Sequence, residues 1–139
     1  MRDRIDEKIK EIENYLEELS SISPASLKEY LNDYKTKAAC ERYFEKIVEA
    51  VIDLAFFIIR EKEFQIPEDD ESSFQILFKE NIISEVLSKK LKLAKGMRNI
   101  IAHEYGSIDD ELVFHSITEE LNEDVEEFVN NIKKLLEGR

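Results

Sequence analysis

Apolar residues recur at helical spacing along most of this chain, and this pattern constrains its fold more than any other feature. Near the N-terminus they advance by four and three residues in turn, which predicts an amphipathic helix over residues 2–20. Similar spacing returns near the C-terminus, at Ile117, Leu121, Val125, Phe128, Ile132 and Leu135. Only three Gly and two Pro occur in 139 residues, so few breakers interrupt the helices. We therefore predict one all-α domain over residues 1–139, built as a helical bundle.

The middle of the chain predicts the central helix of this bundle. The helix is expected from about residue 33 to residue 63, and it is apolar nearly all round between Ile47 and Ile59. Such a helix is buried on most sides, or one of its sides meets another subunit. Its polar positions follow at 3-4-4 spacing, and they are Arg42, Glu45, Glu49 and Asp53. They form either a solvated strip with internal ion pairs or a polar strip that lines a cleft opposite the candidate site.

Capping residues predict where two further helices begin. Ser23 followed by Pro24 is typical of an N-cap and a first helical position, so we expect a short helix from Pro24 to about residue 32. Ser84 is a candidate N-cap for the helix that leads into the candidate site.

The remaining boundaries follow from loop signals. Residues 65–73 contain a proline and an acidic run and predict a loop, followed by a short helix over residues 74–80. Gly106 suits the left-handed position that ends a helix. The last helix is expected to begin at Asp110 or at Thr118 and to reach Leu136.

The charge of the chain limits its partners. The net charge is −12, so the protein as a whole repels nucleic acid and anionic membranes, and any contact with RNA requires a local basic patch. Residues 89–98 provide the one concentrated basic segment, with five positive charges and no negative one. The charged N-terminus predicts no signal peptide, and the longest apolar run falls short of the roughly 20 residues that span a bilayer. We therefore expect a cytoplasmic protein without contact to membrane.

The candidate site is the stretch from Gly96 to Gly106, which places Arg98, Asn99, His103 and Tyr105 within eight residues. On a helix, positions four apart share a face, so the Asn99 amide is expected to orient the His103 ring. Positions seven apart also share a face, which pairs Arg98 with Tyr105. Arg98 and His103 are five apart, or about 140° around the axis. To act on one group they need a distorted helix end, a substrate that reaches around the helix, or a second copy of the motif.

Arginine and histidine together can carry out metal-free RNA cleavage. The planar guanidinium of Arg98 matches a phosphate and stabilises its growing charge. Histidine as a residue type is suited to general acid–base chemistry at neutral pH, so the His103 imidazole can exchange a proton with the ribose 2′-hydroxyl or the leaving oxygen. The alternative is a capping and hydrogen-bonding pair without catalytic activity.

The motif Arg98-Asn99-x3-His103-x-Tyr105 resembles the R-x4-H-x-Y motif of HEPN-domain proteins of the HepT type. These are small helical toxins that are paired with minimal nucleotidyltransferase (MNT) antitoxins. The likeness covers most of the chain: the long apolar helix after Arg42, the segments 74–83 and 93–103, and Ile108-Asp109 before an amphipathic last helix.

This resemblance implies an up-and-down bundle of four to five helices that forms a homodimer, with two motifs facing one cleft. It implies a metal-independent endoribonuclease without a cofactor, in which Arg98 and His103 are catalytic and Asn99 supports them. It also implies that the partner nucleotidyltransferase modifies Tyr105 with AMP and thereby silences the toxin.

Two other interpretations start from the same residues. A non-catalytic HEPN module would use its polar cleft only to recognise a nucleotide or a partner. A metal-carboxylate helical bundle would need Glu-x-x-His pairs, but Ile100 and Leu112 precede the two histidines by three residues. The single cysteine, Cys40, cannot form an internal disulfide, and we expect it to be a helix residue rather than a nucleophile.

Overall fold

The computed structural model describes residues 1–103 and 108–138. Within them no strand occurs, and the predicted all-α class is confirmed. The elements in chain order are α1 (Arg2–Ile22), α2 (Leu27–Asn32), α3 (Tyr34–Glu61), α4 (Asp70–Lys79), α5 (Glu85–His103), α6 (Asp110–His115), the π-helical turn η1 (Ser116–Glu120) and α7 (Leu121–Glu137).

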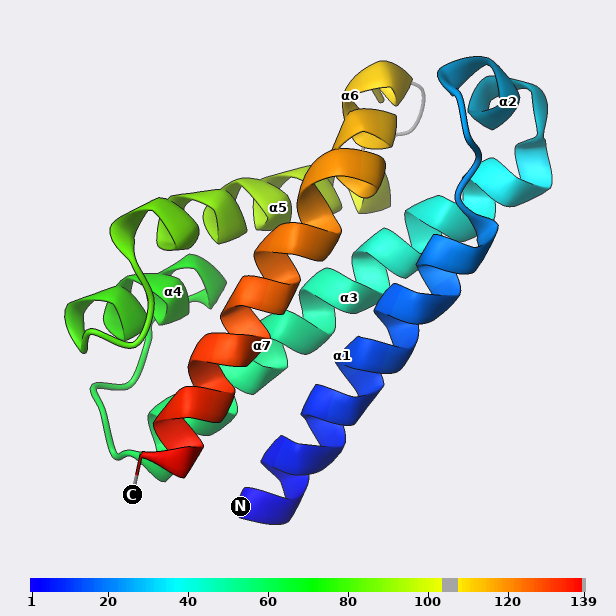
Figure 1. Cartoon of the computed structure of the whole chain (residues 1–139). Coiled ribbons are helices and arrows are strands. Elements are labelled where there is room, and N and C mark those ends of the chain that lie inside the picture. Colours follow the sequence, from blue (N-terminus) through cyan, green and yellow to red (C-terminus); the bar gives the residue numbers. More distant parts are fainter. Residues whose placement is uncertain (104–107, 139) are drawn as a thin grey trace.

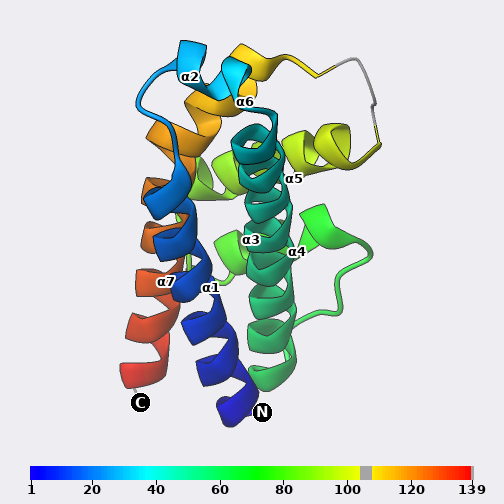
Figure 2. The ribbon, with the colours of Figure 1, turned by 90° about the vertical axis from the view of Figure 1, so that its right-hand side faces the viewer.

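Helix α3 is the centre of the bundle, as its apolar sequence predicts. It packs against α1 along its length and also against α2, α4 and α5. The axes of α1, α3 and α7 are roughly aligned, with α1 running opposite to α3 and α7, whereas α4 and α5 lie to one side and cross these axes (Figures 1 and 2). Both termini lie at the same end of the bundle (Figure 1). Helix α5, which carries the candidate site, is therefore supported from α3, α4 and α7.

The core is apolar and continuous across these helices. Its largest fully buried side chains include four aromatic residues, Tyr30, Phe44, Phe74 and Phe128. The rings of Phe74 and Phe128 meet edge to face at 6.2 Å and join α4 to α7. At the rim, Lys133 of α7 donates to Glu13 of α1 at 2.7 Å.

Side-chain caps set the start of several helices. The Ser84 hydroxyl accepts the Leu87 amide at 3.0 Å, so the predicted N-cap of α5 is confirmed. Asp33 caps α3, one residue before the helix begins. Asp69 caps α4 by accepting the Ser72 amide at 2.8 Å. Because of this cap, α4 begins at Asp70 and not at residue 74, and the loop before it is shorter than predicted.

The second helix begins later than predicted, and its N-cap is a different serine. Ser23 does not begin α2; its hydroxyl donates back to the Leu19 carbonyl at 2.8 Å and closes the end of α1. The N-cap is Ser26, which accepts the Glu29 amide at 3.2 Å. The Glu29 carboxylate in turn accepts the Ala25 amide at 3.0 Å. This reciprocal pair satisfies two free amides three residues later than the Ser23-Pro24 pattern indicates.

The C-terminal helical segment begins at Asp110, the first of the two predicted starts. The second, Thr118, lies inside the π-helical turn η1 between α6 and α7. Buried positions here follow one another at intervals of four, at Val113, Ile117, Leu121 and Val125. Such a stripe drifts around an ordinary α-helix by about 40° per step. The wider π turn takes up part of this drift and keeps the stripe on the core.

No helix in the described part of the chain combines the length and apolar character needed to cross a membrane.

Candidate active site on helix α5

Helix α5 is held in place by its inner face. Leu87, Leu91 and Ile101 are buried there. The buried Ser88 hydroxyl donates to the Phe74 carbonyl of α4 at 3.3 Å. These contacts fix the rotation of α5 about its own axis and therefore the direction of each side chain in the motif.

Arg98 points from α5 toward α3, where Glu49 binds it. Its Nη2 donates to Glu49 Oε1 at 2.5 Å, and its Nη1 donates to Asn99 Oδ1 at 3.1 Å. The Nε atom is buried and has no hydrogen-bond partner among the described residues. The side chain as a whole is 24% exposed. Two acceptors from different helices thus fix the plane of this guanidinium while part of the side chain faces solvent.

Asn99 supports the arginine and not the histidine. Its side-chain oxygen accepts from Arg98, and no hydrogen bond joins it to His103 within the part of the chain that the structure describes. The expectation that Asn99 orients His103 is therefore wrong. The angle argument overlooked the neighbouring Arg98, whose charged donor is the stronger partner for an amide oxygen.

His103 is the last residue of α5, and its side chain is exposed. Arg98 of the same helix points to α3, and the 140° between the two positions stays a prediction from helix geometry. Tyr105 and Gly106, the other predicted members of the site, lie outside the described residues.

The polar residues of α3 were expected either to form ion pairs in solvent or to face the candidate site, and they divide between these two roles. Glu49 faces the motif through Arg98. Arg42 pairs with Glu45 within the strip at 3.7 Å, and Asp53 pairs with Lys8 of α1 at 3.4 Å. Only Glu49 joins the candidate site, and sequence spacing does not separate it from its neighbours in the strip.

The basic segment before the motif is partly neutralised. Lys90 pairs with Asp124 of α7 at 3.6 Å, and Lys92 donates to Gln75 of α4 at 2.6 Å. The positive charge of Lys95 helps to lower the pKa of Asp69, although the hydrogen bond from Ser72 is the main cause. Lys89 is exposed to solvent. The segment supplies less free positive charge than its composition indicates.

The outer face of α5 is apolar and exposed. Val86, Leu93 and Ile100 follow one another at intervals of seven, and 63%, 74% and 44% of their surfaces are exposed. Gly96 lies between the last two, and a Cβ atom added there would meet nothing within 4 Å. We call Val86, Leu93, Gly96 and Ile100 the outer stripe.

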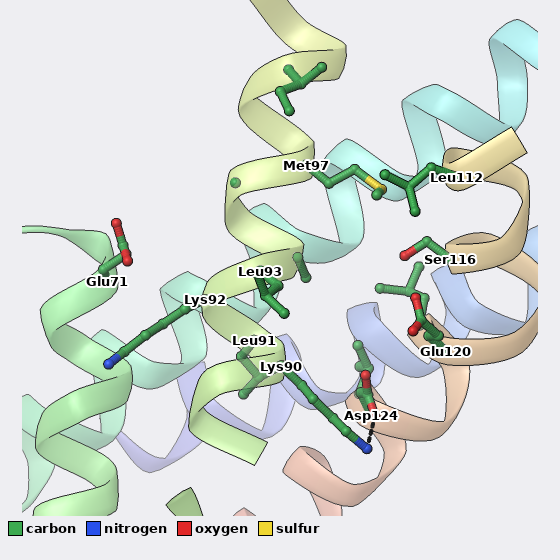
Figure 3. A pocket seen from close by; sticks show the side chains of 15 residues that line it. Glu71, Lys90, Leu91, Lys92, Leu93, Met97, Leu112, Ser116, Glu120 and Asp124 are labelled. Carbon is green, nitrogen blue, oxygen red and sulfur yellow. Dashed lines mark ion pairs between the residues drawn. The ribbon is translucent and has the colours of Figure 1, made fainter. Parts of the chain in front are cut away.

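A groove of about 520 Å³ lies between α5 and the α6–α7 segment (Figure 3), and Leu93, Gly96 and Ile100 of the outer stripe line it. In Figure 3, Met97 of α5 points toward Leu112 of α6 across this groove. Its charged rim holds more acidic than basic side chains, namely Glu71, Glu120 and Asp124 with Lys90 and Lys92. Arg98, Asn99 and His103 do not line it. An apolar floor with an acidic rim suits a protein surface better than a phosphate backbone.

Other titratable groups that sequence reasoning set aside do not join the site. Cys40 is buried in α3, and this burial raises the pKa of its thiol to about 11, which leaves it protonated at neutral pH. His115 contacts Glu119 at 2.6 Å. In the described ranges, no group of three or more His, Cys, Asp and Glu side chains is arranged to hold a metal ion.

Comparison with known proteins identifies relatives of most of the chain. The family model described as Ribonuclease HepT-like matches residues 7–132. An mRNA nuclease HepT from Shewanella oneidensis is 32% identical over 105 residues, which cover 76% of this chain and 78% of the relative. A tRNA nuclease HepT from Aphanizomenon flos-aquae is 29% identical over 114 residues, which cover 82% of this chain and 78% of the relative.

A solved structure extends this likeness to three dimensions. It contains a tri-AMPylated HEPN toxin from Shewanella oneidensis in complex with an MNT antitoxin. Its matched chain superposes with a TM-score of 0.88 at 30% identity, and the match covers 96% of this chain and 98% of that one.

Proposed function

Because the chain belongs to the family of HepT-like ribonucleases, we propose that it is the toxin of a toxin–antitoxin pair and cleaves RNA without a metal ion, through Arg98 and His103. The relatives named as RNA nucleases support the activity, and the HEPN toxin in complex with an MNT antitoxin supports the role.

The chemistry follows from the two side chains. His103 takes the proton of a ribose 2′-hydroxyl, or gives a proton to the leaving 5′-oxygen, as that hydroxyl attacks the neighbouring phosphorus. Arg98 binds the phosphate oxygens and stabilises the charge that grows on them in the transition state. Acid–base help of this kind typically contributes about 10²–10⁴ in rate.

The geometry of Arg98 is the observation that carries this proposal. This side chain is 24% exposed, so a substrate can reach it, and it is fixed by Glu49 and Asn99. A donor group fixed before the substrate arrives is what electrostatic stabilisation of a phosphate requires.

A second copy of the chain completes the site in this proposal. One undistorted α5 directs Arg98 and His103 to different sides, so a two-fold dimer is the simplest way to bring both groups to one cleft. The outer stripe supports this arrangement, because a repeat of seven suits packing between helices and the open position at Gly96 permits close approach. The groove that the stripe partly lines adds apolar residues of α6 and α7, such as Leu112 and Leu121, to the surface available to the second copy.

Tyr105 is the proposed control point. The similar toxin from Shewanella oneidensis is AMPylated in a complex with an MNT antitoxin. We propose that a partner nucleotidyltransferase transfers AMP to Tyr105, two residues after His103. An adenylate there adds bulk and negative charge beside a site that must accept a phosphate, and it therefore blocks RNA binding.

RNA cleavage by purified protein in the presence of a chelator tests the proposal. The wild type is expected to cleave RNA, and Arg98→Ala and His103→Ala are each expected to lower the rate about 10²-fold or more. His115→Ala is the matched control, because His115 is the other histidine and lies outside the site. If the wild type leaves RNA intact and its expression does not slow growth, the protein is a binding module and not a nuclease.

A further inference from the structure

We infer that Glu49 is a positioning residue for this reaction, which holds the guanidinium of Arg98 in the direction that receives the phosphate. The inference rests on the proposed function, and it concerns a residue on a different helix from the motif. Its starting point is the 2.5 Å contact between Glu49 Oε1 and Arg98 Nη2, which joins positions 49 residues apart in the sequence.

Glu49 is well placed to act as a fixed reference point. It lies in the middle of α3, and its neighbours Val48 and Ala50 are buried, with 3% and 2% of their surfaces exposed. The backbone at Glu49 is therefore set by the core of the bundle, while its side chain remains 40% exposed. Glu49 thereby ties a flexible arginine of α5 to the central helix of the bundle.

The contact with Glu49 uses only part of the hydrogen-bonding capacity of Arg98. A guanidinium has five N–H groups. One on Nη2 goes to Glu49 and one on Nη1 goes to Asn99, and the group on Nε is buried without a partner among the described residues. Within the same part of the chain, one N–H on each terminal nitrogen has no acceptor. Donors on a charged guanidinium are suited to bind phosphate oxygens.

Asn99 alone would not fix this arrangement. It is adjacent to Arg98 on the same helix, so its amide moves with α5 and leaves the guanidinium able to swing about that one bond. A second acceptor on another helix removes this freedom. In the strip of α3, the neighbouring acidic residues bind elsewhere, Glu45 to Arg42 and Asp53 to Lys8, so Glu49 fills this role alone among them.

The carboxylate of Glu49 also repels the RNA phosphate, and this gives a distinctive kinetic signature. Loss of a positioning contact lowers kcat, because the reacting groups no longer start in the productive geometry. Loss of a negative charge does not weaken the binding of RNA, so KM stays the same or falls. For Glu49→Ala we expect kcat to fall by about tenfold to a hundredfold without a rise in KM.

Three variants test the role by RNA cleavage. Glu49→Ala removes the contact, Glu49→Gln keeps an oxygen acceptor without the charge, and Asp53→Ala removes a carboxylate one turn further along α3. Glu49→Gln is expected to recover most of the kcat that Glu49→Ala loses, and Asp53→Ala is expected to match the wild type. Circular dichroism verifies that all variants fold equally.

A measurement on Arg98 itself decides the inference independently of cleavage. The Nε–H signal of Arg98 in a nitrogen-15 spectrum, assigned with Arg98→Lys, is expected to be sharp and slow to exchange in the wild type, because Nε is buried. In Glu49→Ala it is expected to broaden and exchange faster, and in Asp53→Ala to stay unchanged.

The inference is overturned if Glu49→Ala leaves the Arg98 signal unchanged, or if it cleaves RNA as fast as Asp53→Ala or faster. Faster cleavage would mean that Glu49 restrains the site instead of positioning it. Because the Arg98 signal is measurable in a protein that cleaves nothing, failure of this inference and failure of the proposed function are separate results.

Discussion

Arg98 and His103 lie on one helix in different surroundings: the guanidinium of Arg98 is bound to Glu49 of α3, whereas His103 is exposed at the end of α5. Their spacing of five residues predicts about 140° between the two positions around the helix axis. In the dimer proposed above, each group therefore acts with its partner on the second copy of the chain. This relationship makes a specific prediction about mixed dimers.

Mixing two inactive variants is expected to restore activity. Arg98→Ala and His103→Ala are unfolded together and refolded, so that about half of the dimers contain one chain of each kind. If Arg98 of one chain acts with His103 of the other, each mixed dimer has one intact pair. About a quarter of the wild-type rate is then expected, measured by RNA cleavage. Mixtures that stay as inactive as the separate variants would show that both groups act from the same chain.

A charge on the outer stripe is expected to separate the dimer. Leu93→Glu places a charge at the centre of the stripe, where the side chain is 74% exposed in the single chain. The substitution should therefore weaken association of the two copies, while the free energy of unfolding changes by no more than about 0.5 kcal/mol. Light scattering after gel filtration should give the mass of a monomer, and RNA cleavage should fall with it.

Ile66→Glu is the matched control for this variant. Ile66 is 84% exposed, and it lies between α3 and α4, away from the stripe. Its dimer and activity should be unchanged. If Leu93→Glu remains a fully active dimer, the second copy binds another surface.

Tyr105 is expected to be the site of AMP transfer. The chain contains five tyrosines, and among the described ones Tyr34 is 85% exposed, so it is the most accessible competitor. After co-expression with a nucleotidyltransferase antitoxin, Tyr34→Phe should gain the mass of adenylate, and Tyr105→Phe should gain none. Tyr105→Phe should also stay toxic in the presence of the antitoxin. Adenylate found on Tyr34 by peptide mass spectrometry would contradict this prediction.

The cap of α4 makes stability depend on pH. The hydrogen bonds from Ser72 hold the pKa of Asp69 below its ordinary value of 3.8. A carboxyl group whose pKa is lower in the folded state than in the unfolded state stabilises the fold at a pH above its unfolded-state pKa. This stabilisation is lost as the pH falls through the folded-state pKa. Wild type should therefore unfold at higher urea than Asp69→Ala at pH 7, and the gap should narrow below about pH 4.

Glu68→Ala removes a neighbouring carboxylate without touching the cap, and it serves as the comparison for Asp69→Ala. Its urea midpoint should follow the wild type across the same pH range. A gap between wild type and Asp69→Ala that keeps its size at low pH would show that the charge of the cap does not contribute.

Local patterns in the sequence were sufficient to predict the helices and one cap. The Ser84 cap was predicted because the serine oxygen can accept a free amide of the first helical turn, and Ser84 directly precedes an apolar stripe. The Ser23 prediction failed because both Ser23 and Ser26 could cap the second helix. Ser26 is the cap because it accepts the Glu29 amide, while the Glu29 carboxylate accepts the Ala25 amide. Choosing between them needs the side-chain geometry of the folded turn.

The sequence was sufficient to name the residues of the candidate site, but it did not predict which of their side chains contact one another. Helical angles place Arg98 and His103 on different sides of α5, and this separation stays a prediction. They paired Asn99 with the wrong neighbour, because an angle contains no information about the strength of competing donors. Glu49 could not be singled out, since its spacing along α3 equals that of Asp53, and only the packing of α5 on α3 distinguishes them.

Gly96 weakens the helix that carries the site. A glycine within a helix costs roughly 0.5–1 kcal/mol relative to alanine, and nothing in the described fold would obstruct the alanine methyl group. An isolated chain would therefore gain from the substitution. If α5 meets its copy at Gly96, that same methyl group would hold two backbones apart, so selection for the assembled toxin would oppose selection for the stability of its subunit.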